Sequence, residues 1–87
     1  MTYKLRVTSH AEKDLGRLVP KIRRQLSEKI LSLRDNARSQ DIKVLKGEEG
    51  AFRVDSGEYR ILFHLEEKMK VVIVFRVKHR RDVYRNL

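Results

Sequence analysis

The sequence predicts an α+β domain built as an N-terminal strand, a helical hairpin and then an antiparallel β-meander, in the order β-α-α-β-β-β. Apolar residues alternate with polar ones at the start of the chain, recur every three or four residues through the next third, and alternate again after Gly50. The 87 residues form a single domain, spanning 1–87, because a chain this short cannot support two separate cores.

The first half of the chain carries the strand and the two helices. Residues 2–8 alternate in polarity, which predicts a half-buried strand. Ser9 is expected to cap the following helix, with Glu12 three residues later completing a capping box. Pro20 closes this helix and suits the first position of the next one, because proline there loses no hydrogen bond. The second helix presents one apolar stripe: Ile22, Leu26, Ile30, Leu33 and Ala37.

The second half is expected to contain the meander. Its three strands are predicted over residues 52–55, 59–65 and 71–77. Ser56-Gly57 and residues 66–68 form the turns between them, and the apolar third strand is expected to be central. Residues 43–50 are expected to be an irregular connection, and residues 79–86 a short basic tail or helix.

Strand alternation sorts the side chains of the meander onto two faces. The helical hairpin must cover one face, because its apolar stripe has no other surface to bury. The covered face is expected to carry Phe52, Val54, Tyr59, Ile61, Phe63, Ile73, Phe75 and Val77. The opposite face is expected to carry Arg53, Asp55, Arg60, Leu62, His64, Val72, Val74, Arg76 and Lys78. Arginines around an apolar floor suit a nucleic-acid strand or a protein segment that mimics one; a second small core with charges on its rim is the alternative.

The charge of the chain favours a polyanionic partner. Twenty-one Lys and Arg against twelve Asp and Glu give a net charge of +9, which attracts nucleic acid. A merely soluble cationic surface, or a patch that meets an acidic protein, remains the alternative. The absence of cysteine excludes a disulfide framework, a thiolate nucleophile and a zinc-finger spacing. Without a recognisable signal peptide or a long apolar run, we expect a cytoplasmic protein that does not enter a membrane.

Four segments of this chain follow the order seen in the RelE/ParE toxin superfamily: residues 45–47 (LKG), 52–54 (FRV), 57–63 (GEYRILF) and 77–85 (VKHRRDVYR). The chain resembles the RelE branch over nearly its whole length. This resemblance implies the toxin of a type II toxin–antitoxin pair, whose cognate small acidic antitoxin covers the basic face in a hetero-oligomer. It also implies an mRNA endonuclease (mRNA interferase) that inhibits translation by entering the ribosomal decoding site. The implied chemistry uses no metal or other cofactor: the ribose 2′-oxygen attacks the adjacent 3′-phosphate and leaves a 2′,3′-cyclic phosphate and a 5′-hydroxyl.

The resemblance also implies roles for individual residues. Arg60 corresponds to the arginine that holds the scissile phosphate, and Arg53 to a basic residue on the preceding strand. Arg80 corresponds to the arginine that stabilises charge at the leaving group, and Tyr84 to a tyrosine that stacks on a base and helps to activate the attacking hydroxyl. Arginine suits charge stabilisation rather than proton transfer, because its pKa lies above about 12. Further contacts with RNA are expected from Lys46, Arg76, Lys78 and Arg81.

One position departs from the family pattern and keeps other functions open. Asp55 stands where RNA-cleaving members often carry a second basic residue, and it shares a face with Arg53 and Arg60. It could pair with either arginine or act as a general base. A ParE-like inhibitor of DNA gyrase without enzymatic activity is therefore the main alternative, and an RNA-binding accessory protein is a weaker one. A ribonuclease using His64 and His79 as acid and base is a third possibility, whereas no metal-ligand spacing is present.

Overall fold

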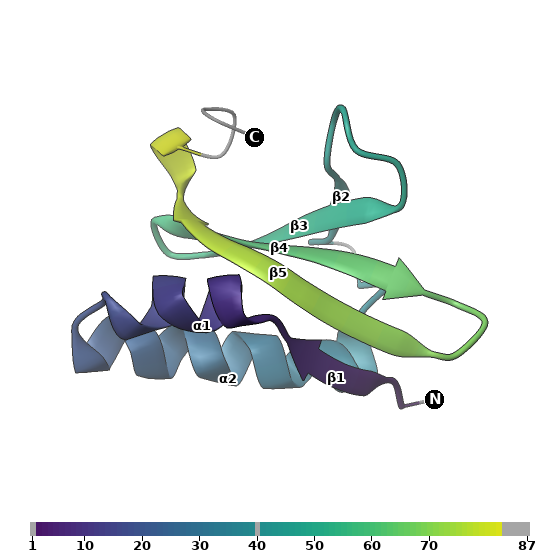
Figure 1. Ribbon diagram of the computed structural model, residues 1–87, viewed down its shortest axis with the longest axis horizontal. Helices are drawn as coiled ribbons and strands as arrows, with labels where there is room; N and C mark the ends of the chain where they lie inside the picture. Colours follow the sequence, from purple (N-terminus) through teal and green to yellow (C-terminus); the bar gives the residue numbers. More distant parts are fainter. Residues whose placement is uncertain (1, 40, 83–87) are drawn as a thin grey trace.

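The computed structural model describes residues 2–39 and 41–82, and it confirms the α+β fold (Figure 1). A mixed sheet of five strands, in the order β1-β5-β4-β3-β2, is covered on one face by two helices. The elements are β1 (Lys4–Val7), α1 (Ser9–Gly16), α2 (Pro20–Asn36), β2 (Lys43–Val44), β3 (Ala51–Ser56), β4 (Tyr59–Glu66), β5 (Val71–His79) and a 3₁₀ helix, η1 (Arg80–Asp82). Strand β1 pairs parallel with β5, and the other neighbouring strands are antiparallel.

Two details of the sheet differ from the prediction. The expected irregular connection contains the short strand β2, which extends the sheet by pairing with β3 through Lys43 and Arg53. The apolar strand β5 lies inside the sheet, but the central strand is β4, because β1 adds to the outer side of β5. Parallel pairing of the chain's first strand is a long-range contact that local polarity does not encode.

The two helices begin at well-defined signals. Thr8, not Ser9, is the N-cap of α1: its backbone is extended and its hydroxyl accepts a hydrogen bond from the N–H of Ala11 at 3.3 Å. The predicted cap was therefore wrong by one residue, since β1 leads directly into Thr8. Pro20 occupies the first turn of α2 as predicted. The apolar stripe of α2 is confirmed: Leu26, Ile30, Leu33 and Ala37 are buried, and Ile22 packs against them.

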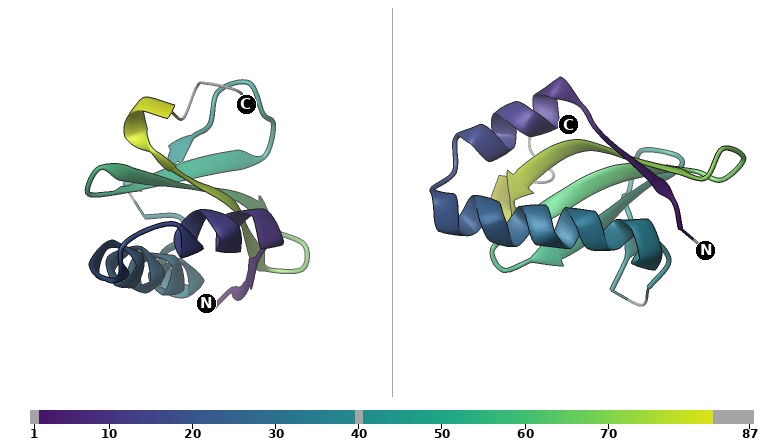
Figure 2. Two further views of the ribbon diagram at one scale, coloured as in Figure 1. Left: turned by 60° about the vertical axis from the view of Figure 1, so that its left-hand side comes forward. Right: turned by 90° about the horizontal axis from the view of Figure 1, so that it is seen from below.

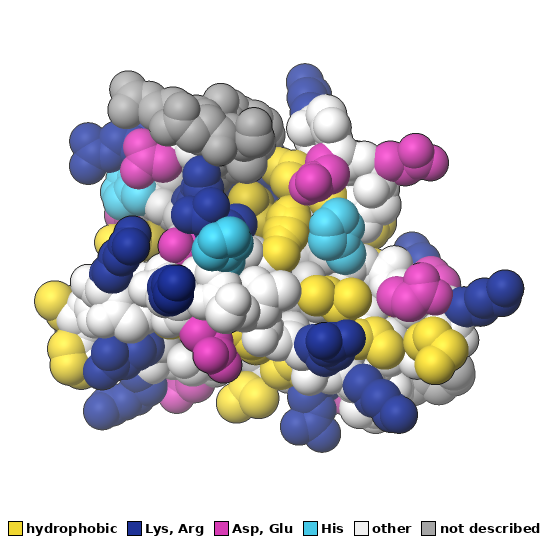
Figure 3. Space-filling model, in the orientation of Figure 1, with side chains coloured by type: hydrophobic (Ala, Val, Ile, Leu, Met, Phe, Trp, Pro, Cys, Tyr) yellow, Lys and Arg dark blue, Asp and Glu magenta, His cyan; other side chains and the backbone are white. Residues whose placement is uncertain are grey.

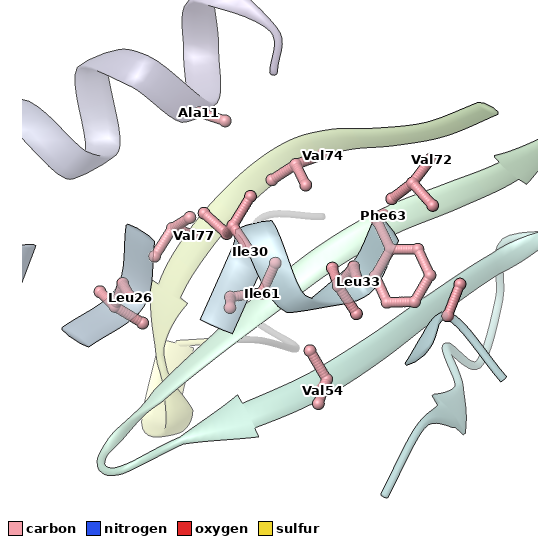
Figure 4. Close-up of a cluster of buried hydrophobic side chains, with 11 residues drawn as sticks. Ala11, Leu26, Ile30, Leu33, Val54, Ile61, Phe63, Val72, Val74 and Val77 are labelled. Carbon is pink, nitrogen blue, oxygen red and sulfur yellow. The ribbon is translucent and has the colours of Figure 1, made fainter. Parts of the chain in front are cut away.

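The main core fills the layer between the helices and the sheet (Figures 2 and 4). Its buried members are Ala11, Leu26, Ile30, Leu33, Ala37, Val54, Ile61, Phe63, Val72, Val74 and Val77. Figure 4 shows Leu33 of α2 directed towards Phe63 of β4. Full burial of a side chain such as Phe63 stabilises the fold by about 1.5–3 kcal/mol. The helices and this core cover one face of the sheet, and the other face carries no helix among the described residues.

A β-bulge in β5 overturns part of the predicted face assignment. Leu62 of β4 pairs with Arg76, whereas its neighbour Phe63 pairs with Val74, so Phe75 is an extra residue in β5. Residues before the bulge are therefore displaced by one position relative to an unbroken strand. Val72 and Val74 face the helices, whereas Ile73 and Phe75 face away from them, the reverse of the prediction.

The face away from the helices carries a second, smaller core. Leu45, Ala51 and Leu62 are buried there and pack with Phe75, whose ring meets His64 at 4.5 Å between ring centroids. Figure 1 shows the β2–β3 loop and η1 rising above this face at opposite ends, and Figure 3 shows hydrophobic side chains in the hollow beside the loop. The predicted apolar floor exists, but of the three apolar residues expected to form it, Leu62, Val72 and Val74, only Leu62 belongs to it.

Candidate nucleic-acid interface

Two arginines on adjacent strands form the centre of the candidate site. Arg53 of β3 and Arg60 of β4 lie on the sheet face away from the helices, with side chains only 17% and 21% exposed. The tight turn between the strands has Gly57 at φ +61°, a conformation that glycine adopts without strain. This turn sets the register that places Asp55 directly opposite Arg60.

Asp55 lies between the two guanidinium groups but leaves the Nε of each arginine without a hydrogen-bond acceptor in the described part of the chain. Its Oδ1 is 3.4 Å from Nη1 of Arg53 and 3.1 Å from Nε of Arg60. The second contact has ion-pair distance but not the alignment of a hydrogen bond, so the Nε of Arg60 remains without an acceptor among the described residues, as does the Nε of Arg53. A buried N–H without an acceptor is costly, so a small movement of either side chain towards solvent would let an external anion supply the missing acceptor.

Arg80 lies at the same end of the sheet as Arg60. Its backbone N–H donates to the carbonyl of Glu58 at 2.8 Å, and its Nε lies 3.0 Å from the carboxylate of the same residue. The strand pairing explains this position, since Tyr59 is opposite His79, the residue before Arg80. Arg60 and Arg80 therefore lie at the same end of β4 and β5, and Arg53, on the neighbouring strand β3, is linked to Arg60 through Asp55. The fourth predicted catalytic residue, Tyr84, lies outside the described residues, and its role stays a prediction.

The residues predicted to contact RNA occupy different places. Lys78 is directly opposite Arg60 across β4 and β5, and Arg81 is exposed on η1. Lys46 is exposed in the β2–β3 loop, which rises above the other end of the face (Figure 1). Arg76 is held at the open edge of β5 by Asp14 of α1, rather than standing free beside the arginine pair. That bond with Asp14 raises the pKa of Arg76.

Asp14 is a structural residue that the sequence did not single out. Its carboxylate accepts bonds from Nε and Nη2 of Arg76, at 2.8 and 3.2 Å, and from the backbone N–H of Val77 at 2.9 Å. It thereby provides a hydrogen-bond acceptor for a backbone N–H at the edge of β5 beyond Val74, where β1 no longer pairs with that strand. These contacts join residues 62 and 63 positions apart, so no local pattern could have predicted them.

The described structure does not pair the two histidines expected of an imidazole-based ribonuclease. His64 packs on Phe75, whereas the ring of His79 packs edge-on against Tyr59 at 5.3 Å, on the side of the main core. His64 and Tyr59, the residue that His79 contacts, are five residues apart on β4, which is a distance of about 17 Å along the strand. Residues 2–39 and 41–82 also contain no cluster of three or more potential metal ligands, and neither of their helices has the length and apolarity to cross a bilayer.

Comparison with known proteins decides the family. Residues 5–84 match the family described as the ParE toxin of the type II toxin–antitoxin system parDE. The chain belongs to the RelE/ParE toxin superfamily. It is 33% identical over 86 residues to toxin RelG of Mycobacterium tuberculosis, covering 98% of this chain and 99% of the relative. It is 27% identical over 89 residues to the putative toxin RelE1 of Methanocaldococcus jannaschii, covering 99% of each.

Solved structures agree with this assignment. The RelBE2 toxin–antitoxin complex of M. tuberculosis contains a chain that superposes with a TM-score of 0.81 at 30% identity, covering 92% of this toxin and 100% of that chain. The archaeal RelE–RelB complex from Pyrococcus horikoshii gives a TM-score of 0.77 at 25% identity, covering 92% and 97%. The protein is a type II toxin of this superfamily. The sheet face that carries Arg53 and Arg60, here called the arginine face, is the candidate for its toxic activity.

Proposed function

We propose that this toxin is a ribosome-dependent, metal-independent mRNA endonuclease acting in the cytoplasm. The observation that carries the proposal is the pair Arg53 and Arg60, whose shielded side chains retain N–H donors without acceptors among the described residues. A phosphodiester offers the anionic oxygens that such donors require. The similarity to RelG and RelE1 toxins supports the same branch of the superfamily.

In this mechanism the ribose 2′-oxygen attacks the neighbouring phosphorus and the bond from phosphorus to the 5′-oxygen breaks. Negative charge grows on the non-bridging oxygens, where Arg53 and Arg60 stabilise it. Arg80, at the same end of the sheet, stabilises the departing 5′-oxygen, which takes up a proton as the 2′-hydroxyl loses one. Tyr84 is proposed to stack on a base and assist removal of that proton. The ribosome contributes by holding the mRNA bent, with the 2′-oxygen in line for attack.

The proposed partners follow from the same face. Two of the similar solved structures are complexes of a toxin with its antitoxin. We propose that this toxin likewise forms a hetero-oligomer with a small acidic antitoxin, whose carboxylates occupy the donors of the arginine face. Exposed cations at its margins, Lys46 and Arg81, add long-range attraction for an acidic chain and for ribosomal RNA.

Inhibition of DNA gyrase is the second candidate, and one observation favours it. Asp55 places a negative charge between Arg53 and Arg60, which weakens the field that an RNA phosphate would meet. The matching family is also described by its ParE member. A gyrase inhibitor needs a binding surface but no arrangement of groups around a scissile phosphate.

The deciding experiment exposes programmed ribosomes and, separately, gyrase to the purified toxin. We expect mRNA cleavage on the ribosome, mapped by primer extension, and unchanged DNA supercoiling by gyrase. Arg60→Ala should abolish cleavage, whereas Arg23→Ala, which removes an exposed charge from α2, should retain it. Intact mRNA together with inhibited supercoiling would reject the endonuclease and favour a gyrase inhibitor.

A further inference from the structure

A pocket of about 290 Å³ lies where the end of β5 meets helix α1, around the strand edge from the arginine pair. Strand β1 stops pairing with β5 at Val74, while α1 continues alongside the later residues of β5. The pocket opens between these elements. Its lining is Asp14, Arg17, Leu18, Tyr59, Arg76, Val77, Lys78, His79 and Asp82.

The charges in this pocket leave a cationic group available to a ligand. The carboxylate of Asp14 is paired with Arg76 and accepts a hydrogen bond from the N–H of Val77, and its side chain is only 10% exposed. Because its charge is balanced by Arg76, it adds little repulsion for an anion. Arg17, at the C-cap of α1, is exposed, and its side chain forms no ion pair or hydrogen bond with another described residue. Lys78 and Asp82 also belong to the lining, which therefore holds three cations (Arg17, Arg76 and Lys78) against two carboxylates.

Two aromatic rings form one side of the pocket. Tyr59 and His79 meet edge to face, with ring planes at 76° and centroids 5.3 Å apart. The Nδ1 of His79 accepts the backbone N–H of Arg81 at 3.3 Å, and its Nε2 lies 3.9 Å from the carboxylate of Glu58. Rings beside cations are the chemistry that binds single-stranded nucleic acid, through base stacking and phosphate contacts.

The size and position of the pocket identify its ligand. Its volume of about 290 Å³ lies just below the range of about 300–1,000 Å³ for small-ligand pockets, which suits one nucleotide rather than a peptide segment. Lys78 lines the pocket and is also the strand partner of Arg60, so the pocket adjoins the arginine face. We propose that this pocket holds one nucleotide of the bound RNA next to the scissile phosphate, with its base against Tyr59 and His79 and its phosphate at Arg17. This inference rests on the proposed function.

Binding of an uncleavable 2′-O-methyl RNA hexamer, measured by fluorescence anisotropy, tests the pocket. We expect Arg17→Ala to weaken binding about fivefold at low salt and to reduce the slope of log K against log salt by about 0.7, the value for one lost single-strand phosphate contact. The matched control Arg23→Ala removes the same charge from α2, away from the pocket lining, and should change affinity less than about twofold. Equal losses in the two variants overturn the proposal, because they would show a field effect of net charge alone.

A local readout makes the test independent of activity. Adding the hexamer to the wild-type toxin should shift the imidazole NMR signals of His79 and leave those of His10, on α1, in place. Tyr59→Leu should weaken hexamer binding by about fivefold to a hundredfold through lost stacking, provided its circular dichroism stays native. Unmoved His79 signals reject the pocket even if ribosomal cleavage succeeds. Shifted signals without cleavage retain the pocket and reject only the proposed reaction.

Discussion

Replacement of Asp55 by Asn removes the charge between Arg53 and Arg60 and keeps the shape of the side chain. A phosphate oxygen bound to the guanidinium group of Arg60 would lie about 5 Å from the Asp55 carboxylate, given that carboxylate's 3.1 Å contact with the same group. Two charges at that distance repel by about 3 kcal/mol at an effective dielectric constant of 20, and by about 0.8 kcal/mol in bulk water. Asp55 is 52% exposed, so the lower figure applies. We therefore expect Asp55→Asn to bind RNA about fourfold more tightly at low salt.

The assay is anisotropy of the uncleavable RNA hexamer with salt as the variable. Asp41→Asn is the matched control: it raises the net charge of +9 by the same single unit, but it removes an acid that pairs with Lys29, away from the arginines. The advantage of Asp55→Asn should shrink as salt rises, since the exposed carboxylate is screened. Equal gains in the two variants, or weaker binding by Asp55→Asn, would refute a phosphate site at the arginine pair.

Three further predictions concern activity and stability. Arg60→Ala and Arg80→Ala should each lower single-turnover mRNA cleavage on ribosomes at least about a hundredfold, the cost of one lost transition-state donor, with native circular dichroism. Asp14→Ala should lower the urea-derived free energy of unfolding by about 2 kcal/mol, because a buried backbone N–H loses its acceptor; Asp14→Asn, which keeps an acceptor, should lose less. The bond from Lys29 lowers the pKa of Asp41 in the folded protein, and because this pair is exposed it stabilises the fold by less than about 1 kcal/mol. The contribution is present above the ordinary pKa of 3.8, so the deficit of Asp41→Asn should shrink below pH 3.8 and vanish once the pH is below the lowered pKa.

The layered fold was predictable because local polarity encodes it. The stripe from Leu26 to Ala37 on α2 and the alternation in β3 and β4 each specify which side is buried, and the structure confirms them. The bulge at Phe75 was not predictable, because β5 is apolar on both faces and a one-residue slip changes no polarity pattern. The error in the face assignment of Val72 and Val74 follows from that single extra residue.

The candidate site divides in the same way. Arg53 and Arg60 were placed correctly on one face because they belong to strands of regular alternation joined by a tight turn. The position of Arg76 depends on Asp14, a partner 62 residues away, and no period in the sequence reports such a contact. The arginine pair was therefore predictable from local sequence patterns. The pocket was not, because it forms only where α1 packs beside the end of β5.

In the proposed mechanism the arginine face positions a phosphodiester for attack by the 2′-oxygen of its own ribose. The most direct measurement is the end-group chemistry of mRNA recovered from programmed ribosomes after a single turnover with the toxin. We expect a 2′,3′-cyclic phosphate on the upstream fragment and a 5′-hydroxyl on the downstream one, and no cut when the nucleotide at the cleavage position carries a 2′-deoxyribose. Intact mRNA, or fragments ending in a 5′-phosphate and a 3′-hydroxyl, would rule out this mechanism.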